Sequence, residues 1–182
     1  DVLLEIGCGL GHWTTVIQRQ VKRVYALDVS DNPMRIAQRR SLQSVGDESS
    51  EYLCASADAL PFSSNSFPKA LAVDVIEHIA DDSAVLNEIY RVLRPGGRLV
   101  MTTLIESRPH YIYRMGFQDH VREYTPAQFS RLLKGSGFLV ESLFHFYYAP
   151  RLFARELQML VERTSVGHSL PISLIIGLFG RL

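Results

Sequence analysis

The chain has 182 residues, which is the size of one ordinary domain. Apolar residues make up 47% of it and charged residues 21%, and 19 basic residues balance 19 acidic ones. This composition is typical of a globular protein, and the lack of a basic excess argues against nucleic acid as a partner.

Apolar, β-branched runs alternate with helical patterns along most of the chain. Apolar residues between Trp13 and Val21 recur at helical spacing, which predicts a helix covering one sheet face. A second helix is predicted over about 32–42, and a third begins at Asp82 and ends at the turn 94–97. The predicted strands of a buried parallel sheet are 2–6, 23–27, 51–55, 70–73 and 98–104.

Beyond the fifth strand, residues 125–128 have the form of a capping box with proline in the first turn. They predict a helix that ends at Gly135 or Gly137. Residues 138–148 predict a strand, and the remainder from Pro150 predicts helices rich in Leu, Phe and Ile.

Strand and helix alternation predicts an α/β fold, a Rossmann-like three-layer sandwich with a mostly parallel sheet and a helical C-terminal extension. Ligands are expected at the carboxyl ends of the strands. We assign the core to residues 1–148 and an apolar helical segment to residues 149–182.

The cysteines and the chain ends add four expectations. Cys8 and Cys54 are too few and too far apart for a recognisable metal cluster or a disulfide framework, so no metal site and a reducing, cytoplasmic location are predicted. The chain opens on the apolar run 2–4 without an initiator Met, so we expect it to be truncated there. The apolar stretch 170–179 is too short for a spanning helix, so none is predicted.

A glycine-rich turn, E-I-G-C-G-L-G, spans Glu5 to Gly11 and follows the first strand. Glycines let the backbone turn sharply and approach a ligand, although the same turn also serves packing in proteins without one. Asp28 ends the second strand 21 residues after Gly7, where nucleotide-binding α/β proteins place an acid for ribose hydroxyls. Its alternative role is that of a turn former.

Charge distinguishes two nucleotide classes. A dinucleotide brings a pyrophosphate to the glycine turn, whereas S-adenosylmethionine brings a sulfonium and an ammonium. Glu5 beside the glycines would repel the first and attract the second. The spacing is G-x-G-x-G, and His12 stands where the dinucleotide fingerprint has its last glycine. Both features favour S-adenosylmethionine.

Two further acids follow strands. Asp58 lies in A-D-A-L-P-F after the third strand, and Asp74 ends the fourth. Asp58 has a candidate role as acceptor of a hydrogen bond from an adenine amino group, with Leu60 and other apolar side chains against the ring. Its alternative role is that of a turn residue before Pro61.

The chain resembles the class I methyltransferases, in particular the small-molecule methyltransferase-domain family that includes ubiquinone and menaquinone biosynthesis enzymes. The resemblance extends from Val2 to about Tyr148, in four ordered blocks. These are L-L-E-I-G-C-G-L-G at 3–11, A-D-A-L-P-F at 57–62, D-V-I-E-H-I at 74–79 and E-I-Y-R-V-L-R-P-G-G-R-L at 88–99.

The resemblance implies a site for S-adenosyl-L-methionine at the strand ends. It also implies methyl transfer by in-line displacement to a small-molecule acceptor. The donor-site residues that it implies are Glu5, Gly7, Cys8 and Gly9 toward the methionine end, Asp28 and Val29 toward the ribose, Asp58 and Ala59 toward the adenine, and Asp74 and Val75 on the floor.

His78 and His120 are the candidate catalytic bases, with Glu77, His110 and Tyr113 as further candidates. The alternative for His78 is a helix-start residue that fixes its loop. His120, Arg122 and Tyr124 alternate along one segment, which predicts that they point together. The alternative is a solvated segment that pins the start of a helix.

The acceptor is expected to be apolar or lipid-like, because residues 108–117 are rich in Tyr and Phe. The basic, amphipathic segment 149–182 has two interpretations, which are a peripheral membrane contact and a cover or oligomer contact. The family's closing antiparallel strand pair shows one strand, at 138–148, and no second, so truncation is expected at this end too.

Two other functions stay open at this point. One is an NAD(P)-dependent oxidoreductase, against which the glycine spacing and Glu5 argue. The other is a non-catalytic binding module with a methyltransferase fold, against which the intact acids Glu5, Asp28 and Asp58 argue.

Overall fold

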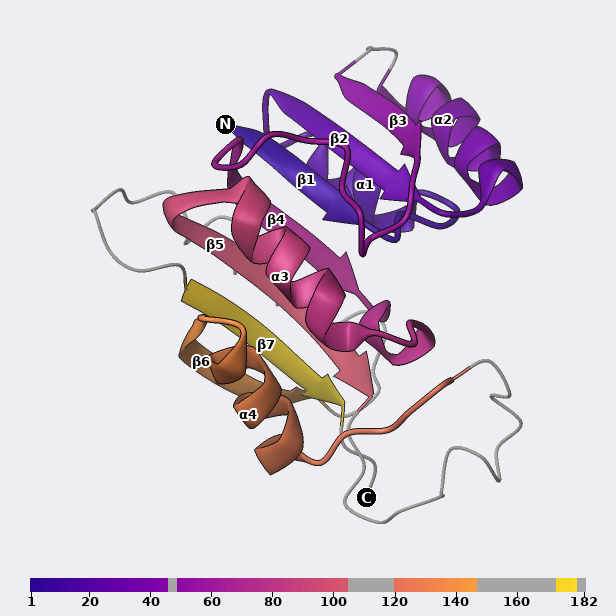
Figure 1. The fold of residues 1–182 in the computed structure, drawn as a ribbon. Coiled ribbons are helices and arrows are strands. Elements are labelled where there is room, and N and C mark those ends of the chain that lie inside the picture. Colours follow the sequence, from indigo (N-terminus) through magenta and orange to yellow (C-terminus); the bar gives the residue numbers. More distant parts are fainter. Residues whose placement is uncertain (46–48, 105–119, 147–172, 180–182) are drawn as a thin grey trace.

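The described strands form one sheet in the order β3-β2-β1-β4-β5-β7-β6, and every neighbouring pair is parallel (Figure 1). This computed structural model describes residues 1–45, 49–104, 120–146 and 173–179. The strands are β1 Val2–Ile6, β2 Arg23–Asp28, β3 Ser50–Cys54, β4 Phe67–Val73, β5 Leu93–Leu104, β6 Leu139–Phe146 and β7 Ser173–Phe179. The helices are α1 His12–Ile17, α2 Asp31–Val45, the 3₁₀ turn η1 Ile76–His78, α3 Asp82–Val92 and α4 Pro126–Gly135.

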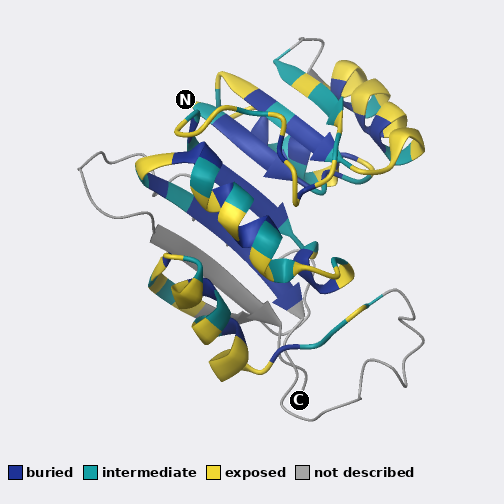
Figure 2. Cartoon of the chain, in the orientation of Figure 1, coloured by how far each residue is buried: buried dark blue, intermediate teal, exposed yellow. Residues whose placement is uncertain are grey.

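The sheet lies between two helical layers. Alternate residues of β1 enter separate hydrophobic clusters, because successive side chains of a strand point to opposite faces. Leu3 packs in a cluster with Ile17 of α1, whereas Leu4 packs with Leu86 and Phe129 of α3 and α4. Figure 1 shows α3 and α4 on the same face, and Figure 2 shows buried central strands beneath helices with exposed outer sides. The predicted α/β three-layer fold is confirmed.

Local capping signals account for where two helices begin. The Asp81 carboxylate accepts a hydrogen bond from the backbone N–H of Ala84 at 2.9 Å, which caps α3. At α4, the Thr125 hydroxyl accepts from the N–H of Gln128, and the Gln128 side chain accepts from the N–H of Thr125 at 2.9 Å. The capping box predicted from the sequence is therefore confirmed.

Element bounds differ most around the turn 94–97. The sequence predicts a strand from Arg98, but β5 already begins at Leu93, which pairs with Phe67. Arg98 pairs with Lys69, so the intervening turn bulges out of the ladder between two paired positions. The turn is present as predicted, within the strand rather than before it.

The helical prediction for the chain after Pro150 is wrong for Ser173–Phe179, which form β7. This strand lies between β5 and β6, so this part of 149–182 belongs to the sheet. A short apolar run rich in Ile fits a buried strand as well as a helix, and periodicity alone does not distinguish them. β7 is the partner for β6 that the sequence did not reveal, and the pair is parallel, contrary to the expected antiparallel pair.

Other expectations about this end of the chain are unchanged. Residues 147–172 and 180–182 lie outside the described residues, and the predicted division at residue 148 stays a prediction. Among the helices described, none is both long and apolar enough to cross a membrane.

We expect Gly11→Ala to destabilise the fold more than Gly9→Ala does. Both glycines have positive φ, at +73° and +48°, so both substitutions carry the left-handed cost of roughly 1–2 kcal/mol. A Cβ on Gly11 would lie 2.9 Å from the backbone Cα of Ala37 in α2, whereas a Cβ on Gly9 meets nothing within 4 Å. Urea unfolding should show an additional loss for Gly11→Ala of about 1–3 kcal/mol. Equal losses would contradict this close approach of α1 and α2.

Candidate functional site

A pocket of about 530 Å³ lies at the carboxyl ends of β1, β2, β3 and β4. This is the edge at which open α/β sheets bind ligands. The lining comes from the segments that follow each strand and from η1. The lining residues are Gly7, Gly9, Leu27, Asp28, Val29, Ala55, Ser56, Ala57, Asp74, Val75, His78, Ile79 and Ala80.

The glycine turn after β1 forms one wall of the pocket. The N–H groups of Gly7 and Cys8 both donate to the carbonyl of Leu27, at 2.8 and 2.9 Å, and join the turn to the end of β2. Gly7 has φ +70°, and a Cβ there would lie 2.3 Å from Cγ2 of Val75. Glycine is therefore required where the turn meets the segment that follows β4.

Asp28 ends β2 and faces the pocket. Its two carboxylate oxygens accept backbone hydrogen bonds, one from Gly9 at 2.8 Å and the other from Ser30 at 2.9 Å. Each carboxylate oxygen can accept a second bond, so the group retains acceptor capacity toward a ligand hydroxyl. The predicted ribose residue is thus held in place by the glycine turn.

Glu5 does not line the pocket. Its side chain is buried between β1 and α1, where it accepts a hydrogen bond from the Thr14 hydroxyl at 2.5 Å. Burial raises the pKa of Glu5 to about 8, against the weaker effect of the Thr14 bonds. The Glu5 carboxyl thus contacts Thr14 and not the pocket lining, and its predicted place at the methionine end of the donor stays a prediction.

Asp74 directly follows β4 and lines the pocket in a left-handed conformation, with φ +53°. A non-glycine residue held in this region is strained, and such strain clusters at functional sites. The Thr102 hydroxyl donates to its carboxylate at 2.8 Å. Asp74 is open to the pocket but surrounded by protein on its other sides, and this desolvation raises its pKa although Thr102, His78 and His120 act to lower it.

Both predicted catalytic histidines lie at one end of the pocket. His78 lines it, and the His120 ring contacts the His78 ring edge to face with centroids 4.6 Å apart. Glu77 is fully buried beside them, and one of its oxygens accepts from the Thr103 hydroxyl at 2.9 Å. Its other oxygen has no hydrogen-bond partner among the described residues. Burial raises the pKa of Glu77 to about 7.

Glu77, His78 and His120 each offer one ligand atom within 4.8 Å of the others. Two imidazoles and a carboxylate are a donor set that suits divalent transition metals. The sequence did not reveal this group, because His120 is distant from the other two residues along the chain. The prediction that the protein has no metal site stays a prediction.

The segment that carries His120 is fixed to the start of α3. The N–H of Val121 donates to the carbonyl of Glu77 at 2.9 Å. Arg122 and Tyr124 both bond to the Asp82 carboxylate, Tyr124 at 2.9 Å. Arg122 and Tyr124 therefore point together toward Asp82, whereas the His120 ring contacts His78. The alternative of a solvated segment that pins the start of the following helix stays a prediction, because these bonds reach α3 and not α4.

Besides Glu5, three predicted donor-site residues do not line the pocket. Cys8 is buried within the glycine turn, and burial raises the pKa of its thiol to about 12. Asp58 and Ala59 are exposed, just beyond the pocket-lining residues that follow β3. The lining residues that sequence reasoning missed are Leu27, Ala55, Ser56, Ala57, Ile79 and Ala80. All of them adjoin predicted strand ends or His78, which is the signal by which they could have been found.

The parallel sheet, the glycine turn and the acid at the end of β2 define a Rossmann-like nucleotide-binding protein. A family model described as "Methyltransferase domain" matches residues 4–101. The chain belongs to this methyltransferase family, and the resemblance found in the sequence is confirmed.

Individual relatives agree with this family. A ubiquinone biosynthesis O-methyltransferase of Aeromonas salmonicida is 26% identical over 160 residues, which are 81% of this chain and 67% of that protein. A demethylmenaquinone methyltransferase of Lactococcus lactis is 34% identical over 128 residues, which are 68% of this chain and 50% of the relative. The chain thus spans about half to two thirds of the length of these relatives.

Solved structures share the fold at lower identity. The YcgJ protein of Bacillus subtilis has a TM-score of 0.68 at 22% identity, over 75% of this chain and 61% of that chain. Geranyl diphosphate C-methyltransferase from Streptomyces coelicolor, in complex with Mg²⁺, geranyl diphosphate and S-adenosyl-L-homocysteine, has a TM-score of 0.67 at 18% identity. That match covers 75% of this chain and 52% of the other.

Replacing Glu5 by Gln should stabilise the protein at high pH and leave it nearly unchanged at pH 5. The pKa of Glu5 is raised from 4.5 to about 8 on folding, so between these values the unfolded state ionises while the folded state keeps its proton. Wild-type stability therefore falls as pH rises through this window, by at most about 1.4 kcal/mol per pH unit. Gln does not ionise, so the free energy of unfolding of Glu5→Gln should not decrease over this pH range.

Urea unfolding of both proteins from pH 5 to pH 9 measures the difference. Glu51→Gln is the matched control, because Glu51 is exposed and pairs only at the surface with Arg23. A Glu5→Gln effect that is independent of pH would contradict the protonated state of Glu5.

Proposed function

We propose that this chain binds S-adenosyl-L-methionine in the pocket and transfers its methyl group to a small-molecule acceptor. The observation that carries the proposal is the charge of the pocket, which has the carboxylates of Asp28 and Asp74 at its wall. Among the described lining residues none is Lys or Arg. A cationic donor gains from this arrangement, whereas a pyrophosphate is repelled.

The proposed donor site uses the predicted residues. Gly7 and Gly9 leave room for the methionine end, Asp28 accepts ribose hydroxyl bonds, and Asp74 lies on the side of the cationic groups. Asp58 and Ala59 follow the pocket-lining residues after β3, where an adenine edge would reach them. Glu5 and Cys8 support the turn from behind, and Val29 adds an apolar surface beside the ribose.

The other two functions receive less support. An NAD(P)-dependent oxidoreductase would place a pyrophosphate against Gly7 and Gly9 beside two carboxylates, without a cation in the described lining to offset them. A non-catalytic module has no need of a His pair of which one member, His78, lines the pocket. The names of the relatives, which are quinone and geranyl diphosphate methyltransferases, also support methyl transfer.

Methyl transfer breaks a carbon–sulfur bond and forms a bond to the acceptor, and the donor leaves as a neutral thioether. The main task of the protein is to hold both reactants in line. Where the acceptor is a hydroxyl, its proton must move to a base, and His78 and His120 are the proposed groups because they lie together at the pocket. Glu77 is the buried carboxyl beside them.

The acceptor itself is proposed to be apolar or lipid-like. This rests on the Tyr- and Phe-rich segment 108–117 and on the quinone and prenyl substrates named for relatives. His110, Tyr113 and this segment lie outside the described residues. A cytoplasmic location with peripheral membrane contact stays part of the proposal, through the residues of 149–182 that lie outside β7.

Asp28→Ala should weaken binding of S-adenosylmethionine by roughly 1–3 kcal/mol, because two ribose hydroxyls lose their acceptor. Calorimetry with S-adenosylmethionine, S-adenosylhomocysteine and NAD measures it, and wild type should prefer the first two ligands over NAD. Asp31→Asn is the control, since Asp31 is exposed and pairs only with Arg35. Unchanged affinity in Asp28→Ala would remove the ribose assignment, and preference for NAD would overturn the proposed function.

His78→Gln should reduce turnover by about 10²–10⁴-fold with a hydroxyl acceptor, as expected for loss of a general base. The assay is a screen of quinone, sugar and lipid acceptors with labelled donor. His12→Gln is the matched control, because His12 is exposed and does not line the pocket.

Treatment with a chelator distinguishes a general-base role of these residues from a metal-ligand role. We expect EDTA to leave wild-type turnover unchanged, as the predicted lack of a metal requires. A loss that a divalent cation restores would instead assign Glu77, His78 and His120 to a metal centre. Unaltered turnover in His78→Gln would remove both roles from His78.

A further inference from the structure

The loop between β3 and β4 is held by two side chains of α3 that the proposed function does not use. Its first residues, Ala55, Ser56 and Ala57, line the pocket, and Asp58 and Ala59 follow directly. Leu60 is then buried in the core. The position of Leu60 therefore decides where the preceding wall of the pocket lies.

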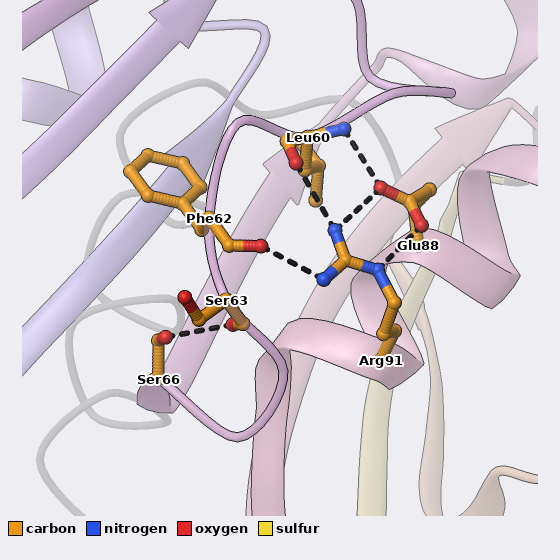
Figure 3. Close-up of polar contacts among 6 residues, drawn as sticks. All are labelled: Leu60, Phe62, Ser63, Ser66, Glu88 and Arg91. Atoms are coloured by element: carbon orange, nitrogen blue, oxygen red, sulfur yellow. Dashed lines mark hydrogen bonds and ion pairs between the residues drawn. The ribbon is translucent and has the colours of Figure 1, made fainter.

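Three backbone groups of this loop bond to one Glu–Arg pair (Figure 3). The Arg91 guanidinium donates to the carbonyls of Leu60 at 3.0 Å and Phe62 at 2.8 Å. The Glu88 carboxylate accepts from the N–H of Leu60 at 2.8 Å. Both polar groups of Leu60 and the carbonyl of Phe62 are thus satisfied from α3.

The pair is itself rigid. Arg91 donates to both oxygens of Glu88, through Nε at 2.6 Å and through Nη2 at 2.7 Å. This two-point contact uses the planar fork of arginine, which lysine cannot reproduce. The bond from Arg91 lowers the pKa of Glu88, so the pair is ionised at neutral pH.

Side-chain packing of Phe62 also fixes the loop, against β4 and β2. The Phe62 ring packs edge to face against two other rings. Its centroid lies 4.8 Å from that of Phe67 and 5.8 Å from that of Tyr25. Phe62 thus joins the loop to β4 and β2 through its ring, and to α3 through its carbonyl. Without the Glu–Arg pair, the apolar anchor would remain while the loop backbone lost three hydrogen bonds.

We propose that Glu88 and Arg91 are positioning residues for the donor pocket, holding the loop 55–62 where it contacts the adenosine part of the donor. The inference rests on the proposed function, because it concerns the same ligand. Neither side chain lines the pocket, so both act through the loop backbone. The motif block 88–99 would thus contain two residues, Glu88 and Arg91, that serve donor binding.

Arg91→Lys should weaken S-adenosylmethionine binding by about three- to tenfold, because lysine can reach only one of the carbonyls. Calorimetry measures the affinity, and hydrogen exchange should show faster exchange confined to residues 55–66. Arg35→Lys is the matched control, because Arg35 forms an ion pair through the same Nε atom with Asp31 within α2, at 2.8 Å. It should change neither quantity.

A chemical rescue separates positioning from general stability. Arg91→Ala with added guanidinium at non-denaturing concentration should recover part of the donor affinity, whereas ammonium at the same ionic strength should not. Glu88→Gln should lose less affinity than Glu88→Ala, since a Gln oxygen still accepts from the N–H of Leu60. Both results follow only if the hydrogen-bonding geometry matters.

The outcomes distinguish this inference from the proposed function. If wild type binds S-adenosylmethionine and Arg91→Lys binds it equally well, the positioning role is overturned and donor binding stands. A fall in thermal stability without a change in the affinity of the folded protein overturns the positioning role in the same way. If wild type fails to bind S-adenosylmethionine at all, the proposed function fails first.

Discussion

Three hydrogen bonds between the turn after β1 and the end of β2 hold the pocket in its shape. Gly7 and Cys8 donate to the carbonyl of Leu27, and Gly9 donates to the Asp28 carboxylate. They continue the β1–β2 pairing past its last paired residues, Ile6 and Leu27. The Asp28 carboxylate is therefore oriented before any ligand arrives, and a preorganised acceptor loses little freedom when it binds.

The two acids that line the pocket, Asp28 and Asp74, were both predicted from the sequence, whereas Glu5 lies outside the lining. Glu5 stands next to the glycines in the chain, so the sequence argument assigned it the attraction for a cation. A strand points successive side chains to opposite faces, and Glu5 consequently faces Thr14 of α1 instead of the pocket. Burial raises its pKa, and the acids that line the pocket are Asp28 and Asp74. The conclusion about the ligand survives because both acids that line this edge favour the same kind of donor.

Local signals predicted local structure well. The first five strands and the four α-helices follow from apolar patterns together with capping and turn residues, and the capping box at Thr125 forms as its spacing requires. β7 was missed because its ladder with β5 and β6 depends on distant partners, and a short apolar run contains no information about them. The same limit applies to the site, where His78 and His120 meet only through the fold.

Helix α3 connects the two sides of the proposed reaction although it contributes no residue to the described lining of the pocket. At its start, Asp82 binds Arg122 and Tyr124 and so fixes the segment that carries His120. Toward its end, Glu88 and Arg91 hold the loop that forms the wall after β3. One buried face, with Val85, Leu86 and Ile89, seats the helix on the sheet. Because both sets of bonds start from one helix, the seating of α3 on the sheet positions the loop after β3 and the segment of His120 relative to each other, and so the proposed donor site relative to the proposed base.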